Sequence, residues 1–106
     1  MQTPLRVTFR HCDHSDALRA RAAELLTRLE KFHDRITSCR AVIEGPSAHH
    51  AKGGKFSINL EVAVPGSIVN VNTAHAPKEA HDDPYAALQD AFDSAKRQLR
   101  HLAMAS

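Results

Sequence analysis

The sequence predicts an α+β fold in which two helices cover one face of a four-stranded sheet. Two kinds of hydrophobic periodicity lead to this class. Four segments alternate apolar and polar residues, and two longer segments place apolar residues three and four positions apart. Their order is β-α-β-β-β-α, and each strand is apolar on one face only. We therefore expect a two-layer sandwich whose second sheet face is open to solvent.

The N-terminal half supplies a strand, a helix and a second strand. Residues 5–10 alternate strictly, and Ser15 then offers a favourable N-cap for a helix. The apolar stripe of that helix consists of Leu18, Ala22, Leu25, Leu29 and Phe32. Residues 36–44 form the next strand and direct Cys39 to the core. A right-handed crossover through the helix predicts that these two strands are parallel.

The C-terminal half begins with a hairpin and ends with a helix. Residues 56–64 alternate most regularly, and Pro65-Gly66 predicts a turn into a strand over residues 69–72. These two strands are expected to be antiparallel. Residues 73–83 have no periodicity and are interpreted as a loop, after which Asp83-Pro84 marks a helix start. The second apolar stripe consists of Tyr85, Leu88, Phe92, Ala95, Leu99 and Leu102.

Composition limits the class of protein further. The chain has 106 residues, 42% of them hydrophobic, with 14 Lys and Arg against 12 Asp and Glu. This length fits one domain and excludes a multidomain enzyme, and a net charge of +2 excludes an overwhelmingly basic nucleic-acid coat. Two cysteines without a CxxC motif, no secretory signal and no long apolar run predict a cytoplasmic protein with reduced thiols and no membrane partner.

The charges are unevenly distributed along the two helices. Arg21, Arg28 and Lys31 fall on one flank of the first apolar stripe. Lys96 and Arg100 flank the second stripe, and Arg97 lies nearly opposite it. Acids at the start and bases at the end of the last helix complement its macrodipole, which explains either helix alone. Two basic flanks side by side also suit a phosphate-binding surface, so both interpretations stay open.

Several segments resemble one family. Residues 29–36, Leu-Glu-Lys-Phe-His-Asp-Arg-Ile, resemble the helix-to-strand junction of the ribosome hibernation promoting factor and ribosome-associated inhibitor A family, also called sigma-54 modulation proteins. Residues 83–88 resemble the start of that family's last helix, and residues 97–99 match its Arg-Gln-Leu. Residues 17–19 match the opening of its first helix. The resemblance covers nearly the whole chain in the right order.

The resemblance implies a fold and a function. Family members fold as β-α-β-β-β-α, with an architecture similar to double-stranded-RNA-binding domains. They bind the small ribosomal subunit between the A and P sites, against ribosomal RNA, and block mRNA and tRNA during stationary phase or stress. For this chain the resemblance implies one ribosome-binding domain over residues 1–106. It implies no enzymatic activity, cofactor or small-molecule substrate.

The family's functional residues carry over to four positions. Arg28 falls on the basic position before the Leu-Glu pair, Lys31 lies in the same turn, Arg97 begins Arg-Gln-Leu, and Tyr85 matches the family's tyrosine. With the other bases of the helix flanks, the expected RNA-binding set is Arg21, Arg28, Lys31, Tyr85, Lys96, Arg97 and Arg100. Tyr85 also belongs to the second apolar stripe, and a place in the core is the stronger interpretation of this residue.

The chain departs from the family pattern in three respects. Leu25 and Ser94 stand where the family often has basic residues, and Lys96 and Arg100 are the nearest substitutes, from neighbouring faces. The loop over residues 74–82 is longer than in short members. The sequence also stops at residue 106, without the C-terminal extension by which long members dimerise ribosomes, so the short form is expected.

Two alternative functions remain open. Eight histidines, including His49 and His50 in one loop and His75 and His81 in another, suit a metal-binding or pH-sensing domain. The spacing does not favour a metal site, however, because no HxxxH or HExxH motif occurs on a predicted helix. A general double-stranded-RNA-binding module is the second alternative. No nucleophile motif, phosphate loop or paired carboxylates suggest a catalytic site.

Overall fold

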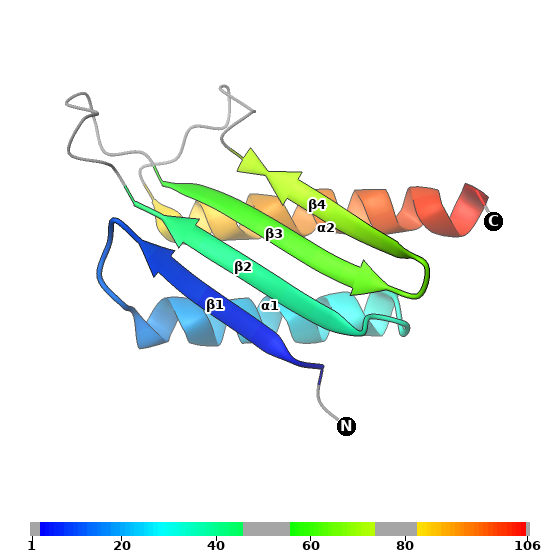
Figure 1. Ribbon diagram of the computed structural model, residues 1–106, viewed down its shortest axis with the longest axis horizontal. Coiled ribbons are helices and arrows are strands. Elements are labelled where there is room, and N and C mark those ends of the chain that lie inside the picture. The colour runs from blue at the N-terminus through cyan, green and yellow to red at the C-terminus, as the bar shows by residue number, and fades with distance from the viewer. Residues whose placement is uncertain (1–2, 46–55, 74–82, 106) are drawn as a thin grey trace.

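The computed structural model describes residues 3–45, 56–73 and 83–105. It confirms the predicted order of elements (Figure 1), which are β1 (Leu5–Arg10), α1 (Asp16–Phe32), β2 (Ser38–Glu44), β3 (Ser57–Val64), β4 (Ser67–Asn72) and α2 (Pro84–Ala105). The boundaries differ from the predictions by one or two residues. The second strand begins at Ser38 instead of Ile36, and the fourth begins two residues earlier than expected.

The four strands form one sheet in the order β1-β2-β3-β4. Strands β1 and β2 are parallel, with Leu5 opposite Cys39, which confirms the predicted crossover through α1. The other two pairs are antiparallel. Gly66 turns the chain between β3 and β4 with a φ of 81°, in the left-handed region where a residue without a Cβ has no steric penalty.

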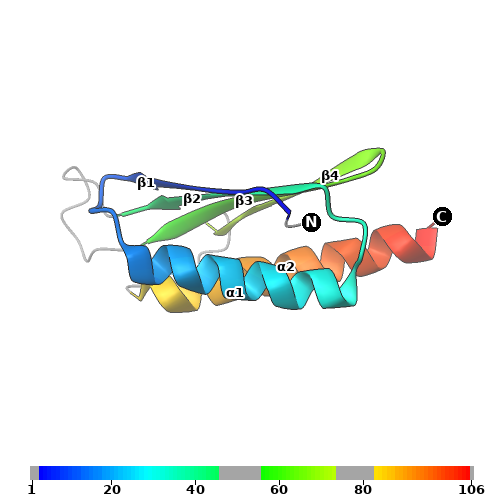
Figure 2. The same cartoon turned by 90° about the horizontal axis from the view of Figure 1, so that it is seen from below.

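Both helices pack on one face of the sheet and run in the same direction (Figure 2). The N-cap predictions are confirmed by hydrogen bonds. The Leu18 backbone N–H donates to Ser15 Oγ at 3.1 Å. The Tyr85 backbone N–H donates to Asp83 Oδ1 at 2.9 Å. Each cap satisfies a backbone donor that the first helical turn leaves without a partner.

The core lies between the sheet and the helices. Its largest fully buried side chains are Ile43, Ile58, Leu60, Leu88, Leu99 and Val62. The predicted stripes are buried in their central turns, but Phe32, Tyr85 and Leu102 at their ends are 41%, 39% and 38% exposed. The core interpretation of Tyr85 was therefore wrong. Near the C-terminal ends of both helices the β3–β4 hairpin curves away from them (Figure 2), so Phe32 and Leu102 have little sheet beneath them. Tyr85 lies at the opposite end of α2, in its first turn.

Cys12 and Cys39 are both free thiols, and Cys39 is buried as predicted. In the part of the chain that the structure describes, neither helix has the length and apolar character needed to cross a membrane.

Candidate nucleic-acid interface

Helices α1 and α2 meet along a shallow groove on the side away from the sheet. The buried side chains of Leu25, Leu29 and Phe92 form its floor, and Arg28 from α1 and Lys96 from α2 line it together with Gln89 and Asp93. The structure thus brings predicted site residues from both helices to one groove. Leu25, which replaces a basic residue of the family pattern, is only 4% exposed and fits the apolar floor.

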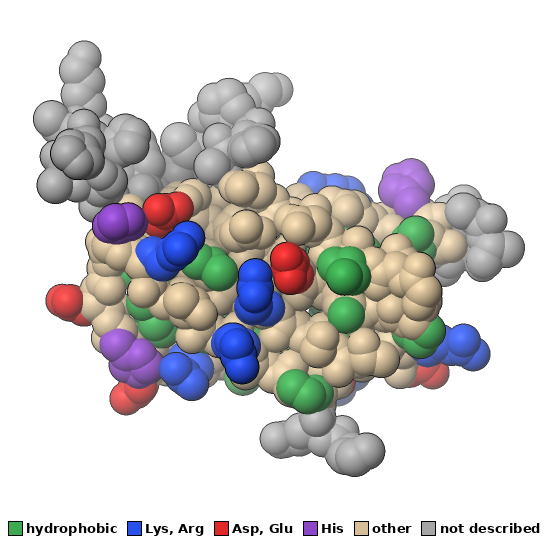
Figure 3. Space-filling view, viewed as in Figure 1, with side chains coloured by type: hydrophobic (Ala, Val, Ile, Leu, Met, Phe, Trp, Pro, Cys, Tyr) green, Lys and Arg blue, Asp and Glu red, His purple; other side chains and the backbone are tan. Residues whose placement is uncertain are grey.

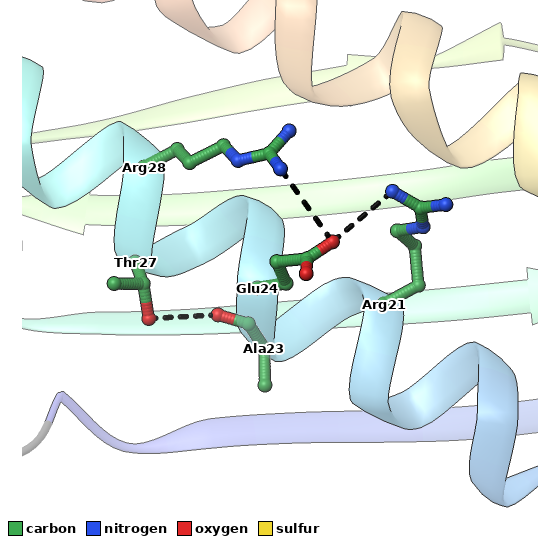
Figure 4. A network of polar contacts seen from close by, with 5 residues as sticks. All are labelled: Arg21, Ala23, Glu24, Thr27 and Arg28. Atoms are coloured by element: carbon green, nitrogen blue, oxygen red, sulfur yellow. Dashed lines mark hydrogen bonds and ion pairs between the residues drawn. The ribbon is translucent and has the colours of Figure 1, made fainter.

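Two arginines of α1 share one carboxylate (Figure 4). Arg21 Nη1 lies 3.1 Å from Glu24 Oε1, and Arg28 Nη2 lies 3.8 Å from the same oxygen. The three side chains are 41%, 62% and 52% exposed for Arg21, Arg28 and Glu24. Exposed ion pairs contribute little to stability. Both guanidinium groups can therefore exchange Glu24 for a phosphate at small cost.

Two basic residues of α2 lie against an aromatic ring at the end of α1. Lys96 Nζ lies 4.8 Å from the centroid of the Phe32 ring, and Arg100 Cζ lies 5.6 Å from it. These cation–π contacts hold two cationic groups beside the last turn of α1. Sequence reasoning assigned Phe32 to the core and missed this role. The available signal was its position as the last apolar residue before the helix ends.

The remaining predicted residues lie outside the groove. Lys31 is exposed in the last turn of α1. Arg97 is exposed and donates from Nη2 to Ser94 Oγ at 2.9 Å, turned about 100° from Lys96 around the helix. Tyr85 lies in the first turn of α2, about 16 Å along the helix from Lys96 given the rise of about 1.5 Å per residue. Of the predicted set, Arg28 and Lys96 line the groove, and Arg21 and Arg100 are linked to them through Glu24 and the Phe32 ring. These four residues are the groove cluster, and Lys31, Arg97 and Tyr85 are exposed outside it.

The described residues do not support a metal centre. Among residues 3–45, 56–73 and 83–105 no group of three or more His, Cys, Asp or Glu side chains is placed to hold a metal ion. His14 Nε2 lies 2.7 Å from Asp16 Oδ1, and His11 Nε2 lies 3.7 Å from Glu44 Oε2. The two histidine-rich segments of the metal-binding alternative lie outside the described residues.

The two cysteines differ in their surroundings. Burial, with a smaller contribution from the charge of Glu30, raises the pKa of the Cys39 thiol to about 12. A thiol with this pKa stays protonated at neutral pH and is a poor nucleophile. Cys12 is half-buried, and its Sγ lies 3.6 Å from the Ile43 carbonyl oxygen. Neither geometry provides an activated nucleophile.

The fold is a small two-layer α+β domain, and cationic side chains from both helices line the groove between them. A family described as "Sigma 54 modulation protein / S30EA ribosomal protein" matches residues 5–104. The chain belongs to this family, which confirms the resemblance found in its sequence.

Individual relatives agree with this assignment. The chain is 29% identical over 91 residues to a "Ribosome hibernation promotion factor" of Deinococcus radiodurans, a match that covers 86% of this chain and 44% of that protein. The chain therefore spans less than half the length of this curated relative. No enzyme class appears in the description of the family or of this relative.

Solved structures show the same fold. A ribosomal subunit interface protein from Coxiella burnetii superposes with a TM-score of 0.76 at 20% identity, covering 96% of this chain and 99% of that one. The N-terminal domain of Thermus thermophilus Protein Y gives a TM-score of 0.68 at 24% identity, covering 95% and 99%. These similarities confirm the predicted α+β sandwich. The expected likeness to double-stranded-RNA-binding domains stays a prediction.

Proposed function

We propose that this chain is a ribosome hibernation factor that binds the small ribosomal subunit, occupies the mRNA and tRNA channel, and so silences translation in the cytoplasm. The family match over residues 5–104, joined to a cationic groove between two helices, is the observation that supports the proposal. Residues 1–106 act as one ribosome-binding domain, without catalysis and without a cofactor. Inhibition follows from steric exclusion of mRNA and tRNA.

The groove cluster makes the principal contact with ribosomal RNA. Arg28 and Lys96 face a phosphate from opposite helices, and Arg21 adds a second guanidinium when Glu24 is released. Arginine pairs with phosphate through charge-assisted and often bidentate hydrogen bonds. Lys31, Arg97 and Tyr85 extend the contact on either side. Structured RNA is recognised largely by shape and backbone, so this surface needs little base-specific readout.

Co-sedimentation with ribosomes tests the proposal. The wild-type chain is added to growth-arrested lysate at low salt, separated on a sucrose gradient, and assayed in parallel for inhibition of cell-free translation. We expect it in small-subunit fractions and expect inhibition. The double variant Arg28→Gln/Lys96→Gln weakens both, because each position supplies a phosphate contact. The control Arg19→Gln/Arg35→Gln removes two exposed charges outside the groove and retains both.

Two outcomes would contradict the proposal. A wild-type chain found only at the top of the gradient at low salt is not a ribosome-binding factor. Equal affinity for arbitrary RNA duplexes and for small subunits favours the general double-stranded-RNA module instead. The metal-binding alternative is not favoured by the family match, and zinc content after dialysis tests it independently.

A further inference from the structure

The sheet face opposite the helices is exposed and basic along β1 and β2. Arg6 and Arg10 of β1 and Arg40 of β2 point to this face, since they alternate with the buried residues of their strands. Figure 3 views this open face and shows Lys and Arg side chains gathered over the half of the sheet formed by β1 and β2. None of these three arginines belongs to the surface assigned above to RNA.

Two of these arginines are direct neighbours across the sheet. Arg6 and Arg40 are register partners in the parallel β1–β2 pair. Like charges opposite each other on adjacent strands destabilise a sheet. Arg40 Nε lies 3.8 Å from Glu61 Oε1, whereas the side chains of Arg6 and Arg10 form no hydrogen bond or ion pair with any described residue. Glu44, the register partner of Arg10, is a second acid on this face beside Glu61, so three arginines stand against two carboxylates and the face keeps a small positive surplus.

These side chains surround a hollow in the open face. Its wall is formed by the three arginines, one carboxylate, Glu44, and hydroxyl and amide groups, among them Thr8, Asn59 and Asn72. Arginine, threonine and asparagine are side chains that commonly bond phosphate oxygens of nucleic acids. Among the described residues that line the hollow none is aromatic, so these residues offer no platform on which a base could stack. The chemistry therefore fits a sugar-phosphate backbone.

A protein partner fits this hollow less well. Protein interfaces depend on buried aromatic, aliphatic or arginine anchors that fill apolar pockets. Val42 is the single apolar side chain in the wall of the hollow that the described residues form. A polyanion with repeated phosphates needs no such anchor and matches several guanidinium groups at once.

We propose that the open sheet face is a second RNA-binding surface, which binds backbone phosphates of an RNA segment different from the one on the helix groove. The two surfaces lie on opposite sides of a sandwich that measures 18 Å along its shortest axis. The domain then lies between two RNA segments and contacts one with each face. This inference rests on the proposed function and extends it to a second face.

Matched variants test the second surface with purified small ribosomal subunits. Arg6→Gln/Arg40→Gln weakens binding more than the control Arg19→Gln/Arg35→Gln. It also lowers the slope of log affinity against log salt by about one to two, because about 0.7 to 0.9 is lost per phosphate contact. Glu61→Gln, which frees Arg40, tightens binding. Hydroxyl-radical footprinting shows that Arg6→Gln/Arg40→Gln and Arg28→Gln/Lys96→Gln each lose a different protected RNA segment.

The outcomes separate this inference from the proposed function. Wild-type binding that is unchanged in both Arg6→Gln/Arg40→Gln and Glu61→Gln overturns the second surface and leaves the groove assignment intact. Loss of the same RNA segment by both double variants also overturns it. Weaker binding with all RNA protections retained assigns the face to a ribosomal protein and overturns the RNA occupant. A wild-type chain that binds no subunits overturns both proposals. Thermal unfolding of each variant checks that it is folded, and Glu61→Gln tests the face without removing an arginine.

Discussion

The ammonium group of Lys96 in α2 lies 4.8 Å from the centre of the Phe32 ring at the end of α1. This contact joins the two helices at a point where the sheet gives little cover, since Phe32 is 41% exposed. Arg100 approaches the same ring at 5.6 Å. One aromatic side chain therefore fixes the position of two cations in the candidate site.

The first prediction concerns the energetic coupling between Phe32 and Lys96. Phe32→Leu retains an apolar side chain but removes the ring, and Lys96→Met removes the charge. In a double-mutant cycle of urea unfolding, we expect a coupling free energy of about 0.5–1 kcal/mol, the range for exposed cation–π pairs. The cycle Phe32→Leu with Arg19→Gln is the control and gives no coupling. Additive single effects for Phe32 and Lys96 would show that the contact contributes nothing to stability.

The second prediction concerns Glu24, which holds Arg21 and Arg28 on the surface of α1. Glu24→Gln removes a negative charge from the candidate site and frees both guanidinium groups, so affinity for small subunits rises and its salt dependence becomes steeper. Unfolding stability changes by about 0–1 kcal/mol, because the pairs are exposed. Asp13→Asn removes an exposed charge elsewhere and leaves affinity unchanged. Weaker binding of Glu24→Gln would contradict the groove assignment.

The third prediction follows from the buried thiol of Cys39. Its pKa is raised from 9.0 to about 12 in the folded chain, so the unfolded chain loses this proton first. The contribution to stability is fully present below pH 9 and is lost as pH rises toward 12, by at most about 1.4 kcal/mol per pH unit. We expect the stability advantage of the wild type over Cys39→Ala to shrink between pH 8.5 and about 10.5 in urea unfolding. If the unfolding free energies of the wild type and Cys39→Ala change in parallel across this range, deprotonation of Cys39 does not contribute to the pH dependence of stability.

The fourth prediction tests the close approach of Gly45 to the turn after β1. A Cβ at this position would lie 2.6 Å from Cys12 Cβ and 2.7 Å from the His11 carbonyl oxygen, and the Gly45 N–H already donates to the Arg10 carbonyl at 2.8 Å. Gly45→Ala therefore destabilises the fold by about 1–3 kcal/mol, as overpacking does. At Gly66 an added Cβ meets nothing within 4 Å, so Gly66→Asn, which tolerates a left-handed backbone, costs less. Equal melting temperatures for the wild type and Gly45→Ala would show that the turn after β1 shifts to accommodate the added Cβ without loss of stability.

The strands, caps and apolar faces were predictable because they are local. Alternation over residues 5–10 and 57–64 determines which side chains enter the core, and Ser15 and Asp83 cap the helices from adjacent positions. The exposure of Tyr85 was not predictable in this way. It depends on where α2 begins relative to the sheet, which helical periodicity does not contain.

The candidate binding surfaces were likewise predictable only in their local features. The basic flanks of both helices were visible in the sequence, but the sharing of Glu24 by Arg21 and Arg28 depends on side-chain conformation. The pairing of Arg6 with Arg40 depends on the register of β1 and β2. A parallel crossover through a helix leaves that register open, because the connection is long enough to allow several.

The last prediction concerns Tyr85, whose ring is 39% exposed in the first turn of α2. Its exposure makes the ring available to stack on an unpaired base, and such stacking contributes about 1–3 kcal/mol per base. Tyr85→Ala then lowers affinity for small subunits by about tenfold or more. Because the side chain is only 39% exposed, thermal unfolding of Tyr85→Ala is measured in parallel, and a modest decrease in melting temperature is expected. Tyr85→Phe is the matched control and keeps wild-type affinity. Wild-type affinity in Tyr85→Ala would remove this residue from the interface, whereas equal losses in both variants would assign the contact to the hydroxyl group.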